Sequence, residues 1–302
     1  MKTFKSVITG GAGFIGSNLT DHLINIGHKV VIIDNFVSGK KSNLAHHKKK
    51  NLKIVNLDIS KCKSLVKYFK GADYVFHLAA LAQVVPSIKN PKKYYKNNVI
   101  GTLNVVEAAK KVKIKKLIYA ASSSCYGAPR KLPTSEKDKI DLKHPYAITK
   151  FISEEIVMSY ASIFKMPNIS LRFFNVYGPR LDILSQYSAV IGNFIWQTKN
   201  KKPLTIVGDG KQTRDFIHVD DLVSALLKLI KSKSVNKIFN LGSGKRTSIN
   251  TIAKIFGGKK KFIPLRSGEV KNSQASILKI KKEINWKPQI PIKEGIKKLL
   301  KS

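Results

Sequence analysis

The first 34 residues constrain the fold most, because they read as a strand, a glycine-rich turn, a helix and a second strand. Residues 5–9 are a short apolar run, and Gly10, Gly13 and Gly16 follow it before a segment of helical periodicity. Glycines let backbone N–H groups approach a pyrophosphate, and the N-terminus of the next helix favours its negative charge. The turn therefore predicts a phosphate-binding loop, although a plain tight turn has the same composition.

The second predicted strand, residues 29–33, ends at Asp34. A carboxylate at this place can accept hydrogen bonds from an adenosine ribose and would repel a 2′-phosphate, which favours NAD over NADP. Lys40 and Lys41 lie nearby and could hold a phosphate, so NADP remains the alternative. Strand, turn, helix, strand and carboxylate together predict a dinucleotide site.

Short apolar strands alternate with helical segments as far as about residue 180. This alternation predicts an α/β fold, a Rossmann-type doubly wound parallel sheet. We predict a dinucleotide-binding domain of residues 1–175 plus about 213–242, and a smaller C-terminal lobe of residues 176–212 and 243–302. Within that lobe, residues 204–210 read as a strand of a hairpin.

Tyr146 and Lys150 are four residues apart, which places both side chains on one face of a helix. A nearby ammonium favours the phenolate, and a phenolate is a general base. In so lysine-rich a chain the pair alone is not diagnostic. Three serines, residues 122–124, end a predicted strand, where ligands bind to open parallel sheets, although serines are also common in turns. His77 lies within an apolar run and is expected to be a core residue.

The formal net charge of +38 raises the question of nucleic-acid or membrane binding. Lysines occur in nearly every polar segment rather than in one patch, so we predict solvated faces, no specific nucleic-acid partner and no membrane insertion. Where arginine is kept against this bias, a planar bidentate fork is the expected reason. The arginines are Arg130, Arg172, Arg180, Arg214, Arg246 and Arg266.

No apolar run approaches the roughly 20 residues of a membrane-spanning helix, and the N-terminal residues do not read as a signal peptide. Cys62 and Cys125 are the two cysteines and have no metal-ligand spacing. We therefore expect reduced thiols, a cytoplasmic location and no metal site.

A series of motifs along essentially the whole chain carries a resemblance to a known family. They are Gly10–Gly16, Asp34-Asn35, Asp58-Ile59, His77–Ala80, Asn97-Asn98, Ser122–Gly127, Tyr146-x-x-x-Lys150, Arg172–Pro179, Arg214–Phe216 and Arg266–Glu269. In this order they resemble the extended short-chain dehydrogenase/reductases, in the NAD-dependent nucleotide-sugar epimerase/dehydratase family. The resemblance implies NAD as cofactor, a UDP-sugar as substrate, and a homodimer formed through the helices at about 94–111 and 146–165.

The resemblance also implies roles for the matched residues. The catalytic residues would be Ser122, Tyr146 as the base, and Lys150. The cofactor-binding residues would be Gly10, Gly13, Phe14, Ile15, Gly16, Asp34, Asn35, Asp58, Ile59, Leu78, Ala79, Ala80, Asn97, Tyr146, Lys150 and Phe174. The substrate-binding residues would be Ser122, Ser123, Ser124, Tyr146, Asn175, Arg214, Arg266, Glu269 and Ser273. For Asp58, a helix N-cap is the alternative to a contact with adenine.

Two features narrow the implied activity. The sugar 4,6-dehydratases of the family carry an Asp-Glu pair directly after the catalytic threonine, where this chain has Ser123 and Ser124, so 4-epimerisation is favoured. Ser273 matches a position where a bulky tyrosine excludes N-acetylated sugars. The chain is thus similar to the bacterial UDP-N-acetylglucosamine 4-epimerases, isomerases that act through a transient 4-keto sugar in polysaccharide biosynthesis.

Two kinds of alternative remain open. On the same fold, the enzyme would be a UDP-glucose 4-epimerase or a UDP-glucuronate epimerase or decarboxylase. In a different class, the chain would be a non-catalytic NAD-binding sensor, against which the intact Ser122, Tyr146 and Lys150 set argues.

Overall fold

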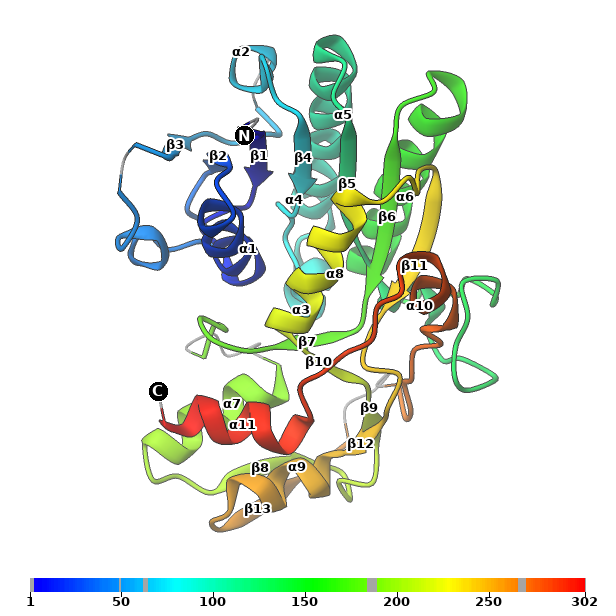
Figure 1. Cartoon of the computed structure of the whole chain (residues 1–302). Helices are drawn as coiled ribbons and strands as arrows, with labels where there is room; N and C mark the ends of the chain where they lie inside the picture. Colours follow the sequence, from blue (N-terminus) through cyan, green and yellow to red (C-terminus); the bar gives the residue numbers. More distant parts are fainter. Residues whose placement is uncertain (1–2, 49, 62–64, 184–188, 266–269, 302) are drawn as a thin grey trace.

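Figure 1 shows the computed structural model, in which a parallel sheet lies between helices and a group of smaller elements sits beneath its one end. The structure describes residues 3–48, 50–61, 65–183, 189–265 and 270–301. The sheet has seven strands in the order β3–β2–β1–β4–β5–β6–β11, all paired in parallel. The strands are β1 (Lys5–Thr9), β2 (Lys29–Asp34), β3 (Leu52–Asn56), β4 (Tyr74–His77), β5 (Lys116–Ser122), β6 (Asn168–Phe173) and β11 (Lys237–Leu241). The predicted doubly wound sheet is confirmed.

The strands are apolar almost throughout because both faces of the sheet are covered. Ile8 and Ile32 point into a core on one face, and Val7 and Val31 point into a second core on the other. Helices α1 (Phe14–Asn25) and α8 (Val219–Lys231) pack on the first face, and α5 (Gly101–Val112) and α6 (Pro145–Ile163) on the second.

The order of the strands reverses between β1 and β4, since β2 and β3 follow on one side and β5 and β6 on the other. At such a point the connecting helices lie on opposite faces of the sheet, and a crevice opens outside the carboxyl ends of the strands. The short elements around the sheet are η1 (Lys41–Leu44), α2 (Val66–Phe69), α3 (Val84–Lys89), α4 (Pro91–Tyr94), η2 (Tyr95–Ile100), η3 (Ser123–Tyr126) and α10 (Leu278–Ile284). Among the described residues, no helix is long and apolar enough to cross a membrane.

The smaller elements enclose a core of their own, which includes Phe194, Ile206, Ile252 and Ile296. They are β7 (Asn175–Tyr177), α7 (Val190–Lys199), β8 (Leu204–Val207), β9 (Thr213–Arg214), β10 (Phe216–His218), β12 (Thr247–Ser248), α9 (Ile249–Phe256), β13 (Lys260–Ile263) and α11 (Ile292–Lys301). This core supports a smaller C-terminal lobe, whose boundaries stay a prediction.

The expected hairpin at residues 204–210 is wrong. Strand β8 pairs in parallel with β13, more than 50 residues later, so that Leu204 lies opposite Lys260. Parallel strands need a crossover rather than a tight turn, and the connection between these two strands includes α9.

A buried ion pair ties α6 to β6. The guanidinium of Arg172 donates to both carboxylate oxygens of Glu154, at 2.6–3.2 Å, and both side chains are almost fully buried. The hydroxyl of Ser170 also donates to Glu154, and Arg172 donates to the hydroxyl of Tyr126. Because α6 carries Tyr146 and Lys150, this pair fixes the position of their helix against the sheet.

We predict that Glu154→Leu or Arg172→Met alone lowers the free energy of unfolding by about 3–5 kcal/mol, because each leaves a buried charge without its partner. The double variant Glu154→Leu/Arg172→Met should lose much less than the sum of the two. Urea unfolding of the four proteins, analysed as a double-mutant cycle, measures this difference. Additive losses would contradict the prediction.

Candidate active site

The turn between β1 and α1 requires glycine at two places. Gly10 has a φ of +74°, and a Cβ there would meet the backbone N of Ala79 at 2.7 Å. A Cβ on Gly16 would lie 2.2 Å from the carbonyl oxygen of Gly10. Glycine alone fits such contacts, so α1 begins close against the carboxyl end of β1, and its first residues line a cavity of about 260 Å³.

The carboxylate of Asp34, at the end of β2, also holds this turn. One oxygen accepts the backbone N–H of Ala12 and the other that of Phe36, both at 2.9 Å. Burial raises the pKa of Asp34 more than these two hydrogen bonds lower it. Each carboxylate oxygen has a second lone pair, so Asp34 keeps acceptor capacity toward the cavity that it lines.

The structure brings most of the predicted cofactor residues to this one cavity, here called cavity 1. Its walls include Gly10, Gly13, Phe14, Ile15, Gly16, Asp34, Asn35, Asp58, Ile59, Leu78, Ala79, Ala80 and Asn97. Asp58 caps no helix: its carboxylate accepts from the N–H and hydroxyl of Ser60, two residues on. Tyr146, Lys150 and Phe174 line a neighbouring cavity instead.

The predicted catalytic residues meet at the carboxyl end of β5. Pro145 begins α6, and the ring of His144 caps it by accepting the N–H of Ala147 at 3.1 Å. The cap places Tyr146 in the first turn of α6 and Lys150 one turn later. Ser122 ends β5, and its side chain lies near that of Tyr146 along the same cavity wall. The serine hydroxyl therefore comes from strand β5, and the tyrosine and the lysine ammonium come from the adjacent helix α6.

In the protein alone, burial disfavours the charged forms of both Tyr146 and Lys150. Burial raises the pKa of Tyr146, although the nearby side chain of Ser122 opposes the rise. Burial also lowers the pKa of Lys150 to about 7, and its Nζ lies 4.3 Å from the ring centre of Tyr119. The expectation that Lys150 lowers the pKa of Tyr146 is thus not met without a further positive charge, because desolvation disfavours both charged forms.

These residues line cavity 2, which has a volume of about 430 Å³. It shares Ile15, Leu78, Ala80, Ala82 and Ala120 with cavity 1, so the two adjoin. The predicted residues along its wall are Ser122, Ser123, Ser124, Tyr146, Lys150, Phe174, Asn175, Arg214 and Ser273. Arg266 and Glu269 lie outside the described residues.

Other residues of cavity 2 had not been predicted. They include Gly127, Lys143, His144, Val176 and Val270. For His144 a signal was available, because its place just before Pro145 and Tyr146 is that of a helix cap facing the same end of the sheet. For Val176 and Val270, ordinary apolar residues, no sequence signal distinguishes a wall from a core.

The polar end of cavity 2 is built where the two lobes meet. The amide of Asn175 donates to the backbone oxygen of Asp215 at 3.2 Å. The guanidinium of Arg214 donates to the backbone oxygens of Thr213 and Lys271, at 3.0 and 3.2 Å. These backbone contacts hold an amide and a guanidinium side by side along the cavity wall.

Two of the arginines kept by this lysine-rich chain serve internal carboxylates, as Arg172 does with Glu154 and Arg180 with Asp21. His77 is confirmed as a core residue: it is 1% exposed, and its two ring nitrogens contact the hydroxyls of Thr9 and Thr102.

Comparison with known proteins gives consistent results. The model of the NAD dependent epimerase/dehydratase family matches residues 6–242. UDP-glucuronic acid decarboxylase 4 from Arabidopsis thaliana is 34% identical over 312 residues, covering 99% of this chain and 68% of that protein. The fold and the cavities described above thus occur in a chain similar to enzymes of nucleotide sugars.

Two solved structures are close in both sequence and shape. UDP-N-acetylglucosamine 4-epimerase from Methanobrevibacter ruminantium, in complex with UDP-N-acetylmuramic acid, has a TM-score of 0.95 and 37% identity, covering 100% of this chain and 98% of that one. UDP-glucose 4-epimerase from Thermotoga maritima, with UDP-glucose, has a TM-score of 0.93 and 32% identity, covering 99% of this chain and 98% of that one.

The lowered pKa of Lys150 leads to a prediction about stability. Between about pH 7 and the ordinary lysine value of 10.5, the unfolded chain binds more protons at this group than the folded chain. Lys150 therefore destabilises the cofactor-free protein at neutral pH, and this penalty fades as the pH rises toward 10.5. Lys150→Met should raise the Tm at pH 7, by about 2–4 °C for each kcal/mol regained, with a smaller gain near pH 10.

Calorimetry of the cofactor-free proteins across this pH range measures the effect. The exposed Lys111→Met is the control, and its Tm should stay close to that of the wild type. A Lys150→Met protein that melts below the wild type at pH 7 would show that the ammonium is not destabilising.

Proposed function

The chain belongs to the NAD-dependent epimerase/dehydratase family, and from this premise we propose that it interconverts UDP-N-acetylglucosamine and UDP-N-acetylgalactosamine by 4-epimerisation. Its cofactor is NAD. The observation that carries the proposal is cavity 2, where Ser122, Tyr146 and Lys150 share a wall with the small Ser273. No acidic pair follows Ser122, which supports epimerisation over dehydration.

The residues of cavity 1 fit NAD. Gly13 leaves the backbone open at the N-terminus of α1, where a pyrophosphate is favoured. Asp34 would hold the adenosine ribose, and Asp58 lies further along the same wall. Tyr146 and Lys150, where the two cavities adjoin, would hold the nicotinamide ribose. When bound, NAD would supply a reversible hydride acceptor, so that no net oxidation of the sugar would result.

The chain's own residues would move the proton. The phenolate of Tyr146 takes the proton of the sugar 4-hydroxyl, and Ser122 hydrogen-bonds to the same oxygen. The positive charges of Lys150 and of the bound cofactor favour the phenolate. Asn175 and Arg214 anchor the diphosphate, with Arg266 in the same predicted role outside the described residues. Because only the diphosphate end is anchored, the 4-keto sugar would be free to rotate and present its opposite face between the two hydride transfers.

A second candidate is a UDP-glucuronate epimerase or decarboxylase. Lys143 favours it, because this lysine lines cavity 2 and offers a cation to a sugar carboxylate. Its Nζ already lies 2.8 Å from a carboxylate oxygen of Asp141, which supports the uncharged N-acetyl sugar as the first choice.

The homodimer and the cytoplasmic location stay predictions. Exposed apolar side chains on or beside the predicted interface helices support the dimer, among them Tyr95, Ile100, Leu103, Ile163 and Phe164. Sedimentation velocity of the wild type would decide it, and a strictly monomeric protein would exclude it.

We predict that UDP-N-acetylglucosamine, incubated with the protein and NAD without a reductant, yields the anomeric proton signal of the galacto epimer in NMR spectra. No NADH should accumulate. Turnover of UDP-glucose or UDP-glucuronate alone would overturn the choice of sugar and keep the chemistry. No turnover of any UDP-sugar would overturn the enzymatic proposal. Tyr146→Phe is the control: turnover should fall by about 10²–10⁴-fold, while NAD stays bound because cavity 1 is unchanged.

Ser273→Tyr tests the sugar pocket. A tyrosine ring in the wall of cavity 2 would fill the space that we assign to the N-acetyl group, so kcat/KM for UDP-N-acetylglucosamine should fall by at least about tenfold. Turnover of UDP-glucose should persist. Ser273→Ala, which stays small, should keep both activities. Equal losses on both sugars in Ser273→Tyr would show that this position does not select the sugar.

A further inference from the structure

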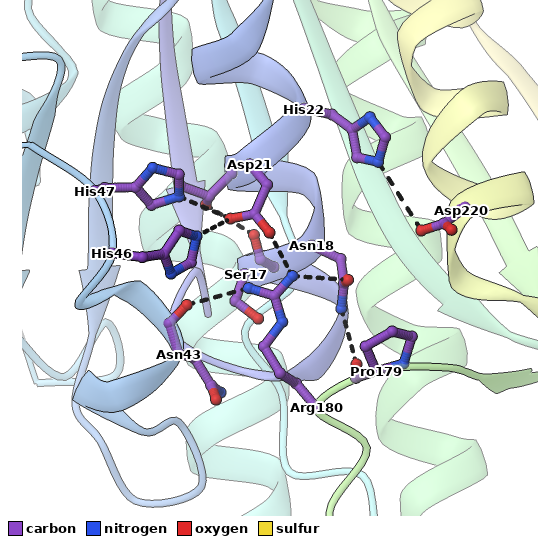
Figure 2. Close-up of polar contacts among 12 residues, drawn as sticks. Ser17, Asn18, Asp21, His22, Asn43, His46, His47, Pro179, Arg180 and Asp220 are labelled. Atoms are coloured by element: carbon purple, nitrogen blue, oxygen red, sulfur yellow. Dashed lines mark hydrogen bonds and ion pairs between the residues drawn. The ribbon is translucent and has the colours of Figure 1, made fainter. Parts of the chain in front are cut away.

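A second cluster of chemically reactive side chains lies outside both cavities, on the outer side of α1 (Figure 2). Asp21 belongs to α1, and His46 and His47 follow η1 in the connection from β2 to β3. Among the residues that the structure describes, this is the group of histidine, cysteine and acidic side chains whose ligand atoms lie close enough to share one ion.

The two imidazoles converge on one oxygen. Nε2 of His47 lies 2.7 Å from Oδ1 of Asp21, and Nε2 of His46 lies 3.0 Å from the same atom. The ring centres are 4.1 Å apart. Figure 2 shows both rings turned toward the carboxylate from the same side. Two neutral rings must both present Nε2–H to this oxygen, whereas a cation between the three atoms would use their lone pairs instead.

The distances are near those of a coordination sphere. Imidazole nitrogen and carboxylate oxygen bind Zn²⁺ at about 2.0–2.2 Å, which places neighbouring ligands of a tetrahedral ion about 3.3 Å apart. The observed separations are shorter by a few tenths of an ångström. His46 is 54% exposed and His47 only 9%, so His46 can move outward to admit the ion, and solvent can supply a fourth ligand.

The carboxylate is held in place on its other side. Nη2 of Arg180 donates to Oδ2 of Asp21 at 2.5 Å and to the side-chain oxygen of Asn18 at 2.8 Å. Hydrogen bonds from Arg180 and His47 thus hold the two oxygens of Asp21 from opposite partners. The contact with Arg180 orients the carboxylate, as hydrogen-bond partners behind a metal ligand do in metal sites. The charge of Arg180 also opposes a cation, so we expect a moderate affinity.

We propose that Asp21, His46 and His47 form a binding site for one divalent transition-metal ion such as Zn²⁺. The site would act on the loop that follows β2. This loop carries Asn35 of cavity 1, and it is fastened to the glycine turn where Lys40 N–H and the Asn43 amide donate to the carbonyl oxygen of Ala12, at 3.0 and 2.9 Å. A bound ion would join the far end of this loop to α1 and so brace one wall of cavity 1.

The test uses the full chain without a polyhistidine tag, freed of metal by a chelator and titrated with Zn²⁺ by calorimetry and with Co²⁺ by visible absorption. The wild type should bind one ion per chain and show the d–d absorption of non-octahedral Co²⁺. His46→Gln/His47→Gln should weaken binding by at least about tenfold. Asp21→Asn is avoided because it would also release Arg180.

The matched control is His22→Gln. His22 lies beside Asp21 in the sequence, but its Nε2 lies 3.9 Å from Asp220 instead (Figure 2), so its loss should leave the affinity unchanged. Circular dichroism confirms that each variant is folded. No binding by the wild type, unchanged binding by the double variant, or an equal loss in His22→Gln would overturn the proposal. Neither NAD nor a sugar is needed, so its failure is independent of the proposed enzymatic activity.

Discussion

The close contact between β1 and α1 is the constraint on which the remaining arrangement depends. A side chain at Gly16 would overlap the carbonyl of Gly10, and one at Gly10 would overlap the backbone of Leu78 and Ala79, just after β4. This contact sets α1 against the point where the strand order reverses, and Asp34 locks the turn from β2. A crevice at this place follows from the topology, and the N-terminus of α1 beside it favours a negative charge.

Burial affects both members of the proposed catalytic pair, Tyr146 and Lys150, in the same direction. In the protein alone, desolvation shifts both Tyr146 and Lys150 toward their neutral forms. A positive charge placed beside them reverses the balance for the phenol, because it favours phenolate. A phenolate that forms only when the nicotinamide is bound would not take a proton from a sugar while no hydride acceptor is present. If the proposed roles hold, the same burial that destabilises the ammonium would couple proton transfer to cofactor binding.

Sequence patterns predicted the features that depend on neighbours in the chain. The apolar runs of β1, β2 and β5 and the four-residue spacing of Tyr146 and Lys150 needed no tertiary information. The pairing of β8 with β13 was missed because β13 begins with two lysines and carries no apolar run. The cluster of Asp21 with His46 and His47 was missed for a similar reason, since about 25 residues separate its members and only tertiary contacts between α1 and the segment after η1 join them.

The arginines show where such reasoning ends. Scarcity predicted that each kept arginine needs a planar fork, and Arg172 and Arg180 do use one, but on carboxylates of the protein. Nothing in the sequence separates these from Arg214, which lines cavity 2. The two arginines differ in where their backbone lies. Arg172 belongs to β6, inside the central sheet, whereas Arg214 belongs to the short strand β9, at the junction of the lobes. The family fold therefore places cofactor and substrate at the ends of the strands, while our proposal for the sugar depends on residues such as Ser273, which the fold leaves free to vary.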